Sequence, residues 1–430
     1  MVLMVKAEEL SREIIQQITL RSFRGLESLE KDVIKIVEAV RTHGDEAILE
    51  FTRKFDGVEL KPDLMRAKKE DFEAAYRSVR PEEIRALKRA ASNIERFHKN
   101  QLQRIEFKQS VGGVMLGVVV RPISSIGIYA PGGKTSYPSS ILMCAIPAKV
   151  AGVERIIACS PPSFRGRFNP HMLVASEIAG VTEFYSIGGA QAVAAMAYGT
   201  ASVRPVEKIV GPGNIYVTVA KQLLSRHVSI DLPAGPSEIL IIADESADPE
   251  YVAADLLAQA EHDENAQCIL LTTSEKIGRE VKRILDRMLA SSMPSSVSRA
   301  ALEKGGLIAV VHDLKEAAGI SNEIAPEHLV IMTRDPWSVF RAIRNAGLVF
   351  LGKYSPVAVG DYSAGTNHVL PTGGYARTYS GLSVRDFIKT IGYVRCSKTG
   401  LRRLARETLT LAEIEHLQAH SNSVKVRGIL

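Results

Sequence analysis

Short apolar segments alternate with glycine-rich turns and helix-like stretches over much of the chain. In the first series, apolar runs such as VERIIACS lead through polar or glycine-rich turns into segments with helical spacing. A second series follows, with the strand-like segments SEILIIAD, QCILLTT, GLIAVV, HLVIMT and GLVFLG. Short apolar strands joined by helices are typical of parallel sheets that helices cover. The sequence therefore predicts an α/β fold with two tandem Rossmann-like parallel-sheet domains.

The remaining regions give the expected domain organisation. Before residue 110, apolar residues recur three and four positions apart, which predicts helices, and LRRLARETLTLAEIEHLQAH near the end predicts one more helix. The segment 352–381 is rich in Gly, Ser, Thr and Tyr and is expected to be irregular. The predicted parts are an N-terminal helical segment (1–25), a first α/β domain (26–128 plus 238–380), a second α/β domain (129–237) and a small C-terminal helical extension (381–430).

Composition excludes several classes of protein. The 430 residues are 46% hydrophobic and 24% charged, with a net charge of +6, which is ordinary for a globular protein. The basic excess lies in the tail, without the dense basic runs and interleaved aromatics of a nucleic-acid-binding arm. No apolar run is long enough to predict a membrane span or a signal peptide. The widely spaced cysteines form no CxxC motif, which indicates reduced thiols and a cytoplasmic protein; they are Cys144, Cys159, Cys268 and Cys396.

Three glycine turns follow strands of the first series. They are APGGK (130–134), IGGAQ (187–191) and VGPGN (210–214). Ligands of open parallel sheets bind beyond the carboxyl ends of the strands, and free amides at a helix start suit phosphates. Together the turns favour a phosphate-bearing ligand, although each alone could simply be a tight turn. The chain has neither the G-x-G-x-x-G fingerprint nor the Walker A spacing, so neither standard nucleotide motif is present.

Polar side chains with catalytic chemistry occur at three places. Glu327 and His328 directly precede a predicted strand, and an acid beside an imidazole can act as a general base and activate water. Asp361 and His368 lie in the polar loop GDYSAGTNHVLPTGG, and His420 ends the last predicted helix. A solvated loop histidine, or a charge at a helix end, is the alternative interpretation.

A further pair lies at the end of the helix predicted to begin near residue 249. Gln259 and His262 are three residues apart, so they share one face of that helix. By residue type alone, Glu261 would be the better metal ligand, since an amide oxygen is an unusual ligand for zinc. A surface or core histidine is again the alternative to a metal site.

Eight ordered blocks across the chain resemble the histidinol dehydrogenase family. They are IGIYAPGGKTSYPSSILMCAIPAKVAGV, GGAQAVAAMAYGT, KIVGPGN, DLPAGPSEILIIAD, DLLAQAEHDENAQ, APEHL, SPVAVGDYSAGTNHVLPTGG and LTLAEIEHLQAH. The resemblance implies a zinc-dependent and NAD-dependent homodimer with shared active sites. It implies four-electron oxidation of L-histidinol through L-histidinaldehyde to L-histidine, the last steps of histidine biosynthesis. It also implies that 129–237 binds NAD, that 26–128 plus 238–380 carries the catalytic and metal residues, and that 381–430 reaches the partner subunit.

The resemblance also implies a role for each matching residue. The implied catalytic residues are Glu327 and His328. The implied zinc ligands are Gln259, His262, Asp361 and His420, the last from the partner subunit. The implied NAD contacts are Tyr129, Gln191 and Asn214. The implied substrate contacts are Ser237, Gln259, His262, His328, Asp361, His368, Glu415 and His420.

Mechanistic expectations follow from these roles. His328 would accept the proton in each oxidation, and Glu327 would activate the water that attacks the aldehyde. A covalent route through Cys144 or Cys159 is not expected, because neither has a base nearby in the sequence. Lys134 departs from the family pattern and leaves the affinity for NAD open. The competing interpretations are a related NAD-dependent dehydrogenase of another polar alcohol, and an inactive NAD-binding or assembly protein.

Overall fold

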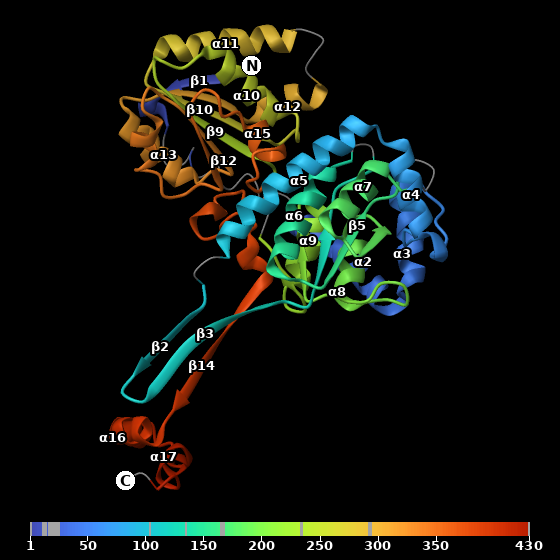
Figure 1. Ribbon diagram of the computed structural model, residues 1–430. Coiled ribbons are helices and arrows are strands. Elements are labelled where there is room, and N and C mark those ends of the chain that lie inside the picture. Colours follow the sequence, from blue (N-terminus) through green and yellow to red (C-terminus); the bar gives the residue numbers. More distant parts are fainter. Residues whose placement is uncertain are drawn as a thin grey trace.

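Two parallel β-sheets and a projecting antiparallel arm make up the protein in the computed structural model (Figure 1). The structure describes residues 2–10, 15, 26–102, 105–133, 136–163, 168–232, 235–290 and 295–428. Lys134 lies outside these ranges. Among the helices described, none combines the length and the apolar character needed to cross a bilayer.

The larger sheet has six parallel strands in the order β1-β11-β10-β9-β12-β13. It confirms all five strands predicted in the second series. The strands are β1 (Leu3–Lys6), β9 (Glu238–Ala243), β10 (Gln267–Thr272), β11 (Gly306–Val310), β12 (His328–Met332) and β13 (Leu348–Leu351).

The prediction that residues 1–25 are helical is wrong at β1. This strand pairs in parallel with β11 and so covers an edge that would otherwise leave β11 with unpaired backbone groups. Helical spacing cannot be recognised in so short a segment, and pairing with a distant strand decided its conformation. Most of the rest of this segment, 11–14 and 16–25, lies outside the described residues.

Helices cover both faces of the six-stranded sheet because the apolar residues of its strands point alternately to either side. Ile239 and Ile241 of β9 pack with one group of helices, whereas Leu240 and Ile242 pack with the other. The first group is α10 (Pro249–Ala260), α11 (Glu275–Ala290) and α12 (Ser296–Gly305). The second group is α13 (Leu314–Ile324) and α14 (Pro336–Phe340).

The smaller sheet has five parallel strands in the order β6-β5-β4-β7-β8 and lies between β1 and β9 in the chain. It confirms the strands predicted in the first series and adds β8. The strands are β4 (Ser125–Tyr129), β5 (Arg155–Ser160), β6 (Glu183–Ser186), β7 (Lys208–Val210) and β8 (Ser229–Ile230). The connecting helices are α6 (Pro138–Ala151), α7 (Pro170–Ala179), α8 (Gly189–Tyr198) and α9 (Ile215–Leu224).

The N-terminal helices belong to the five-stranded sheet rather than to the six-stranded one. Val33 and Ile48 share a buried core with Val193 and Ile209, and Ile94 shares another with residues of β4 and α6. The sequence-based grouping of 26–128 with 238–380 is therefore wrong for these helices, since their apolar faces cover the smaller sheet. They are α2 (Leu26–His43), α3 (Asp45–Phe51), α4 (Lys69–Ser78) and α5 (Pro81–Gln101).

A three-stranded antiparallel arm projects from the body and carries the C-terminal helices at its far end (Figure 1). Its strands run in the order β14-β3-β2, so the predicted extension 381–430 is not wholly helical. The single helix predicted near the end is also wrong, because the chain breaks at His416, whose φ of 56° is left-handed. The elements are β2 (Phe107–Val111), β3 (Val114–Pro122), β14 (Ile388–Cys396), α16 (Lys398–Ile414) and α17 (Gln418–Lys425).

Short helical elements occupy the remaining connections. The segment predicted to be irregular, 352–381, is mostly so, with one helix that the sequence did not reveal, α15 (Val357–Tyr362). The single-turn elements are η1 (Ala7–Glu9), η3 (Thr52–Asp56), η4 (Pro62–Leu64), η6 (Tyr375–Arg377) and η7 (Val384–Phe387).

Candidate active site

A cavity of about 740 Å³ lies where the two sheets face each other. The five-stranded sheet contributes the turn after the carboxyl end of β7, as expected for a parallel sheet. The six-stranded sheet instead contributes residues just before the amino ends of β9 and β12. Seven of the predicted site residues line the cavity, namely Asn214, Ser237, His262, Glu327, His328, Asp361 and His368.

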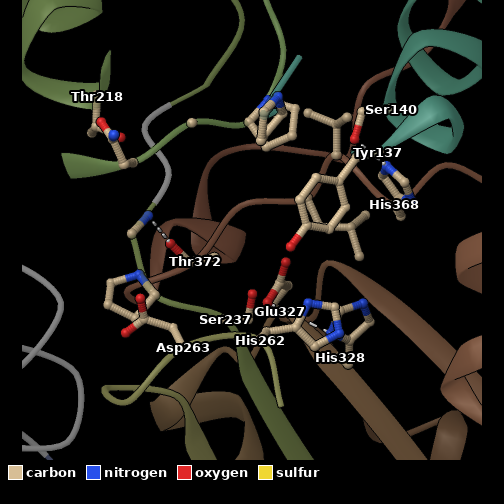
Figure 2. A pocket seen from close by; sticks show the side chains of 18 of the residues that line it. Tyr137, Ser140, Thr218, Ser237, His262, Asp263, Glu327, His328, His368 and Thr372 are labelled. Carbon is tan, nitrogen blue, oxygen red and sulfur yellow. Dashed lines mark hydrogen bonds and ion pairs between the residues drawn. The ribbon is translucent and has the colours of Figure 1, made fainter. Parts of the chain in front are cut away.

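The close view shows these side chains gathered from distant parts of the chain. Ser237, His262, Glu327 and His328 lie together on one side, and His368 lies on another (Figure 2). Of the seven, Asp361 lies in the short helix α15 (Val357–Tyr362), and the others come from loops or from the first residue of a strand. Their convergence therefore depends on the packing of the two sheets and could not be read from local sequence spacing.

The turn before β12 aims the catalytic candidates into the cavity. Helix α13 ends at Ala325, a non-glycine residue with φ of 54°, and its N–H still donates to the carbonyl of Ser321. A left-handed alanine is sterically unfavourable, so the surrounding structure must hold it there. Three residues later the chain enters β12 at His328, and Glu327 and His328 are both nearly fully buried.

Glu327, His328 and Asp361 form a buried charged cluster. Nδ1 of His328 lies 3.6 Å from Oε2 of Glu327, and Nε2 lies 3.5 Å from Oδ1 of Asp361. Nδ1 also lies 3.2 Å from the carbonyl oxygen of Glu238, which can only accept a hydrogen bond. The proton of a neutral His328 therefore belongs on Nδ1, which leaves Nε2 as the basic atom.

Burial and neighbouring charges shift the pKa values of this cluster in opposite ways. Burial raises the pKa of Glu327 from 4.5 to about 7, against the opposing effects of His328 and the N–H of Glu238. Burial lowers the pKa of His328, but the carboxylates of Glu327 and Asp361 outweigh it and raise the value from 6.5 to about 9. One imidazole thus shares its positive charge with two carboxylates.

His368 is held between the two parts of the site. Its Nδ1 lies 2.9 Å from the carbonyl oxygen of Asp361, and its Nε2 lies 3.3 Å from the hydroxyl of Ser140 on α6. Burial lowers the pKa of His368, so the neutral ring is favoured. A neutral imidazole with one proton on Nδ1 can offer Nε2 as an acceptor to Ser140 or to a ligand.

Gln259 lies at the end of α10 and is only 2% exposed. Neither its Oε1 nor its Nε2 has a hydrogen-bond partner within the described part of the chain. A buried amide without partners is costly, and such groups call for an explanation. Glu261, the alternative by residue type, is exposed, so the helix buries the amide and turns the carboxylate outward.

The donor set of this region fits a metal ion that prefers nitrogen and oxygen ligands. His262 follows Gln259 on the same turn, its backbone N–H donating to the Gln259 carbonyl, and the charge of Asp361 acts on its imidazole. Oδ1 of Asp361 is buried without a hydrogen bond, like the amide of Gln259. Within the described ranges, no three His, Cys, Asp or Glu side chains lie close enough together to hold a metal ion by themselves.

The predicted NAD contacts are arranged around the carboxyl edge of the five-stranded sheet. Asn214 lines the cavity, and its Oδ1 caps α9 by accepting the N–H of Val217 at 3.2 Å. Tyr129 and Gln191 are buried beside it rather than in the cavity lining. The hydroxyl of Tyr129 accepts the N–H of Gly189 at 3.2 Å, so it fixes the second glycine turn.

Two predicted residues lie far from the cavity of their own chain. Glu415 and His420 are exposed and belong to the far end of the arm, Glu415 at the end of α16 and His420 in α17 (Figure 1). Within a single chain they therefore do not join the other site residues. The arm itself has only a small core, formed by Ala405 and Val424 with two flanking leucines.

Several residues of the site gave no signal in the sequence. Tyr137 and Ser140 line the cavity from the start of α6, and Thr372 lines it from the irregular loop. The Thr372 hydroxyl accepts the N–H of Gly235 at 2.5 Å, which joins two cavity loops. Glu238 contacts both catalytic candidates through its backbone. The only feature of the sequence that could have indicated a role for any of these residues is nearness to the glycine turn APGGK. This applies to Tyr137 and Ser140 alone.

The cysteines take no part in this site. Cys144 and Cys159 are fully buried, do not line the cavity, and have pKa values that burial raises well above the usual range. All four cysteines are free thiols. A covalent step on either residue would need an accessible thiolate, so the structure favours the non-covalent expectation.

Comparison with known proteins assigns the family. The sequence model of histidinol dehydrogenase matches residues 20–428. The chain belongs to the histidinol dehydrogenase family. Its relatives include the histidinol dehydrogenase of Methanothermobacter thermautotrophicus, 48% identical over 425 residues that cover 99% of each chain. That of Caldanaerobacter subterraneus subsp. tengcongensis is 49% identical over 98% of this chain and 97% of its own.

A solved structure of the histidinol dehydrogenase family agrees with the fold. The enzyme from Elizabethkingia anophelis superposes with a TM-score of 0.93 at 39% identity, covering 99% of this chain and 97% of its own. The two chains therefore share one overall fold over nearly their whole lengths. The predicted family and the predicted α/β fold class are both confirmed.

Proposed function

We propose that this protein oxidises L-histidinol to L-histidine through L-histidinaldehyde, with NAD as the hydride acceptor and zinc in the active site. It would act as a homodimer in the cytoplasm, at the end of histidine biosynthesis. The observation that carries the proposal is the convergence of Glu327, His328 and Asp361 in one cavity. His262 also lines this cavity, three residues after Gln259, whose buried amide has no hydrogen-bond partner among the described residues.

Gln259, His262 and Asp361 would hold the zinc together with His420 of the partner subunit. When bound, zinc would supply a positive charge that anchors the imidazole and amine of the substrate, and NAD would supply the hydride acceptor. The exposed position of His420 at the end of a projecting arm supports a contribution to a neighbouring subunit. Exposed apolar side chains along the arm, such as Phe107 and Val394, support the same arrangement.

Each oxidation removes one proton and one hydride from the substrate. His328 accepts the proton in its neutral form, at Nε2, because Nδ1 is committed to the carbonyl of Glu238. Glu327 receives a proton from the water that adds to the aldehyde, through Oε1, since Oε2 accepts the N–H of Glu238. A carboxylate with a pKa of about 7 is well matched to proton transfer near neutral pH. The buried position of both groups keeps the reactive aldehyde away from bulk water.

Product counting tests this proposal. Purified protein loaded with zinc should release two NADH for each L-histidinol consumed, with L-histidine as the product. A ratio of one would indicate a dehydrogenase that stops at the aldehyde. Turnover of another polar alcohol but not of histidinol would support the related-dehydrogenase alternative, and NAD binding without turnover would support an inactive binding protein.

A further inference from the structure

A buried ion pair lies directly behind the turn that follows β7. Nζ of Lys221, on α9, pairs with Oδ1 of Asp231, which follows β8, and the two side chains are only 5% and 1% exposed. Both are deep in the smaller domain, and neither lines the cavity. A buried charged pair needs an explanation, because an apolar pair of similar size often gives equal or greater stability.

The two charged groups hold one residue from both sides. Nζ of Lys221 donates to the carbonyl oxygen of Gly211 at 3.0 Å, and Oδ2 of Asp231 accepts the N–H of the same glycine at 2.7 Å. Hydrogen bonds to charged groups are stronger than those between neutral ones. Both polar groups of the Gly211 backbone are therefore fixed in a place where water does not reach.

Gly211 needs such support because its conformation is unusual. Its φ is 111°, and a Cβ at this position would collide with the carbonyl oxygen of Tyr129. The next three residues, Pro212, Gly213 and Asn214, all line the cavity. The orientation of Gly211 thus sets where the cavity-lining part of the turn lies.

Helix α9 connects the ion pair of Lys221 and Asp231 to the cavity. Asn214 is the N-cap of α9, and Lys221 is on that helix, about two turns further along. A shift of the turn would move both the cap and the backbone of Pro212 and Gly213. Because the ion pair is neutral overall, it contributes position rather than charge to the ligand.

We propose that Lys221 and Asp231 are positioning residues that hold the Gly211–Asn214 turn in the shape that receives the dinucleotide. The inference rests on the proposed use of NAD and does not depend on which alcohol is oxidised. It assigns the pair a role in cofactor affinity that neither residue could have through direct contact.

The primary test compares Asp231→Asn with a matched control, Glu183→Gln. Glu183 also belongs to a buried ion pair of the smaller domain, with Arg155 at 2.7 Å, but both residues begin strands at the opposite edge of the sheet. We expect Asp231→Asn to raise the Kd and KM for NAD on the order of tenfold, since small misplacements near a site are costly. Glu183→Gln should leave both values near wild type, and zinc content and KM for histidinol should change in neither variant.

A second variant separates positioning from stability. Lys221→Met combined with Asp231→Asn leaves no unpaired buried charge, so its Tm should exceed that of Asp231→Asn alone. Its affinity for NAD should stay low, because the Gly211 carbonyl now also lacks its donor, Nζ of Lys221. Recovery of both Tm and NAD affinity in the double variant would overturn the inference, as would equal effects of Asp231→Asn and Glu183→Gln on NAD.

The binding titration is made without substrate, so that the two proposals can fail separately. If wild-type protein binds NAD but does not oxidise histidinol, only the proposed function fails. If wild type is active and Asp231→Asn binds NAD normally, only the positioning role fails. If wild type binds no NAD, both are rejected.

Discussion

The backbone N–H of Glu238 donates to Oε2 of Glu327 at 2.8 Å, and so the first residue of β9 orients the acid that precedes β12. The carbonyl of Glu238 lies 3.2 Å from Nδ1 of His328, so the same residue also fixes the imidazole. Its side chain accepts the N–H of Gly373 at 2.9 Å and ties down the loop that carries Thr372. One buried residue thus connects the proposed catalytic pair, Glu327 and His328, with the irregular loop.

Glu238→Ala should lower kcat on the order of tenfold, because it frees the loop at Gly373 while leaving the backbone contacts to Glu327 and His328 in place. Glu238→Gln keeps an oxygen acceptor for the Gly373 N–H and should retain most of the activity. Steady-state kinetics of the two variants, at equal zinc loading, give the comparison. Equal loss in both would mean that the charge of Glu238 matters, rather than its hold on the loop.

Glu327→Gln should separate the two oxidations. An amide cannot accept the proton of the attacking water, so oxidation of the aldehyde should fall by about 10²–10⁴-fold. Oxidation of the alcohol depends on Nε2 of His328 and should survive better. NADH formation is measured separately with histidinol and with histidinaldehyde as the starting substrate. Equal loss of both steps would contradict the role assigned to Glu327.

Shared active sites predict that complementary variants restore each other. Glu327→Gln changes the body of one chain, whereas His420→Ala changes the arm, so a mixed dimer has one site with both native residues. Random pairing makes half of the dimers mixed, so recovery to about a quarter of wild-type aldehyde oxidation is expected. The two chains are co-expressed with different tags, and histidine formation is measured.

The matched control for this experiment uses two changes in the body. Glu327→Gln and His368→Ala both alter the cavity of their own chain, so no site in a mixed dimer is intact. This pair should show no recovery. Recovery here, or none with His420→Ala, would contradict a site completed by the partner's arm.

The sequence predicted the two sheets well because their strands are buried on both faces and read as continuous apolar runs. It did not reveal the arm, since every residue of β2 is exposed and no apolar alternation marks an inner face. An amphipathic helix likewise shows that it packs on something, without showing which sheet. The helices α2–α5 were therefore assigned to the wrong domain.

The residues of the candidate site likewise include some that the sequence predicted and others that it did not. Its catalytic and metal candidates came from a family resemblance, and the structure brings His262, Glu327 and Asp361 to one cavity. Glu238, Lys221 and Asp231 looked like ordinary charged residues, because their importance lies in backbone contacts across the fold. Only the packed structure shows which peptide groups they hold.

Low pH should reduce the thermal stability of the smaller domain, because Glu183 becomes protonated. Burial raises the pKa of this carboxyl, but hydrogen bonds from Arg155 and Tyr185 outweigh it and lower the value from 4.5 to about 2. Because the pKa of Glu183 is lower in the folded state than in the unfolded state, its ionised carboxylate stabilises the fold at pH values above 4.5. This stabilisation is lost as the pH falls toward 2. The difference in Tm between wild type and Glu183→Gln should shrink across this interval. A difference that stays constant would exclude the ionised carboxylate as its source.

Zinc content and stability of Gln259→Leu test the central claim most directly. Leucine removes the two unpartnered amide atoms, each of which costs about 1–3 kcal/mol when buried. Metal-free Gln259→Leu should therefore unfold at the same temperature as metal-free wild type or higher, whereas wild type alone should retain one zinc per chain after dialysis. A metal-free variant that is clearly less stable than wild type, or one that still retains its zinc, would contradict this account of the site.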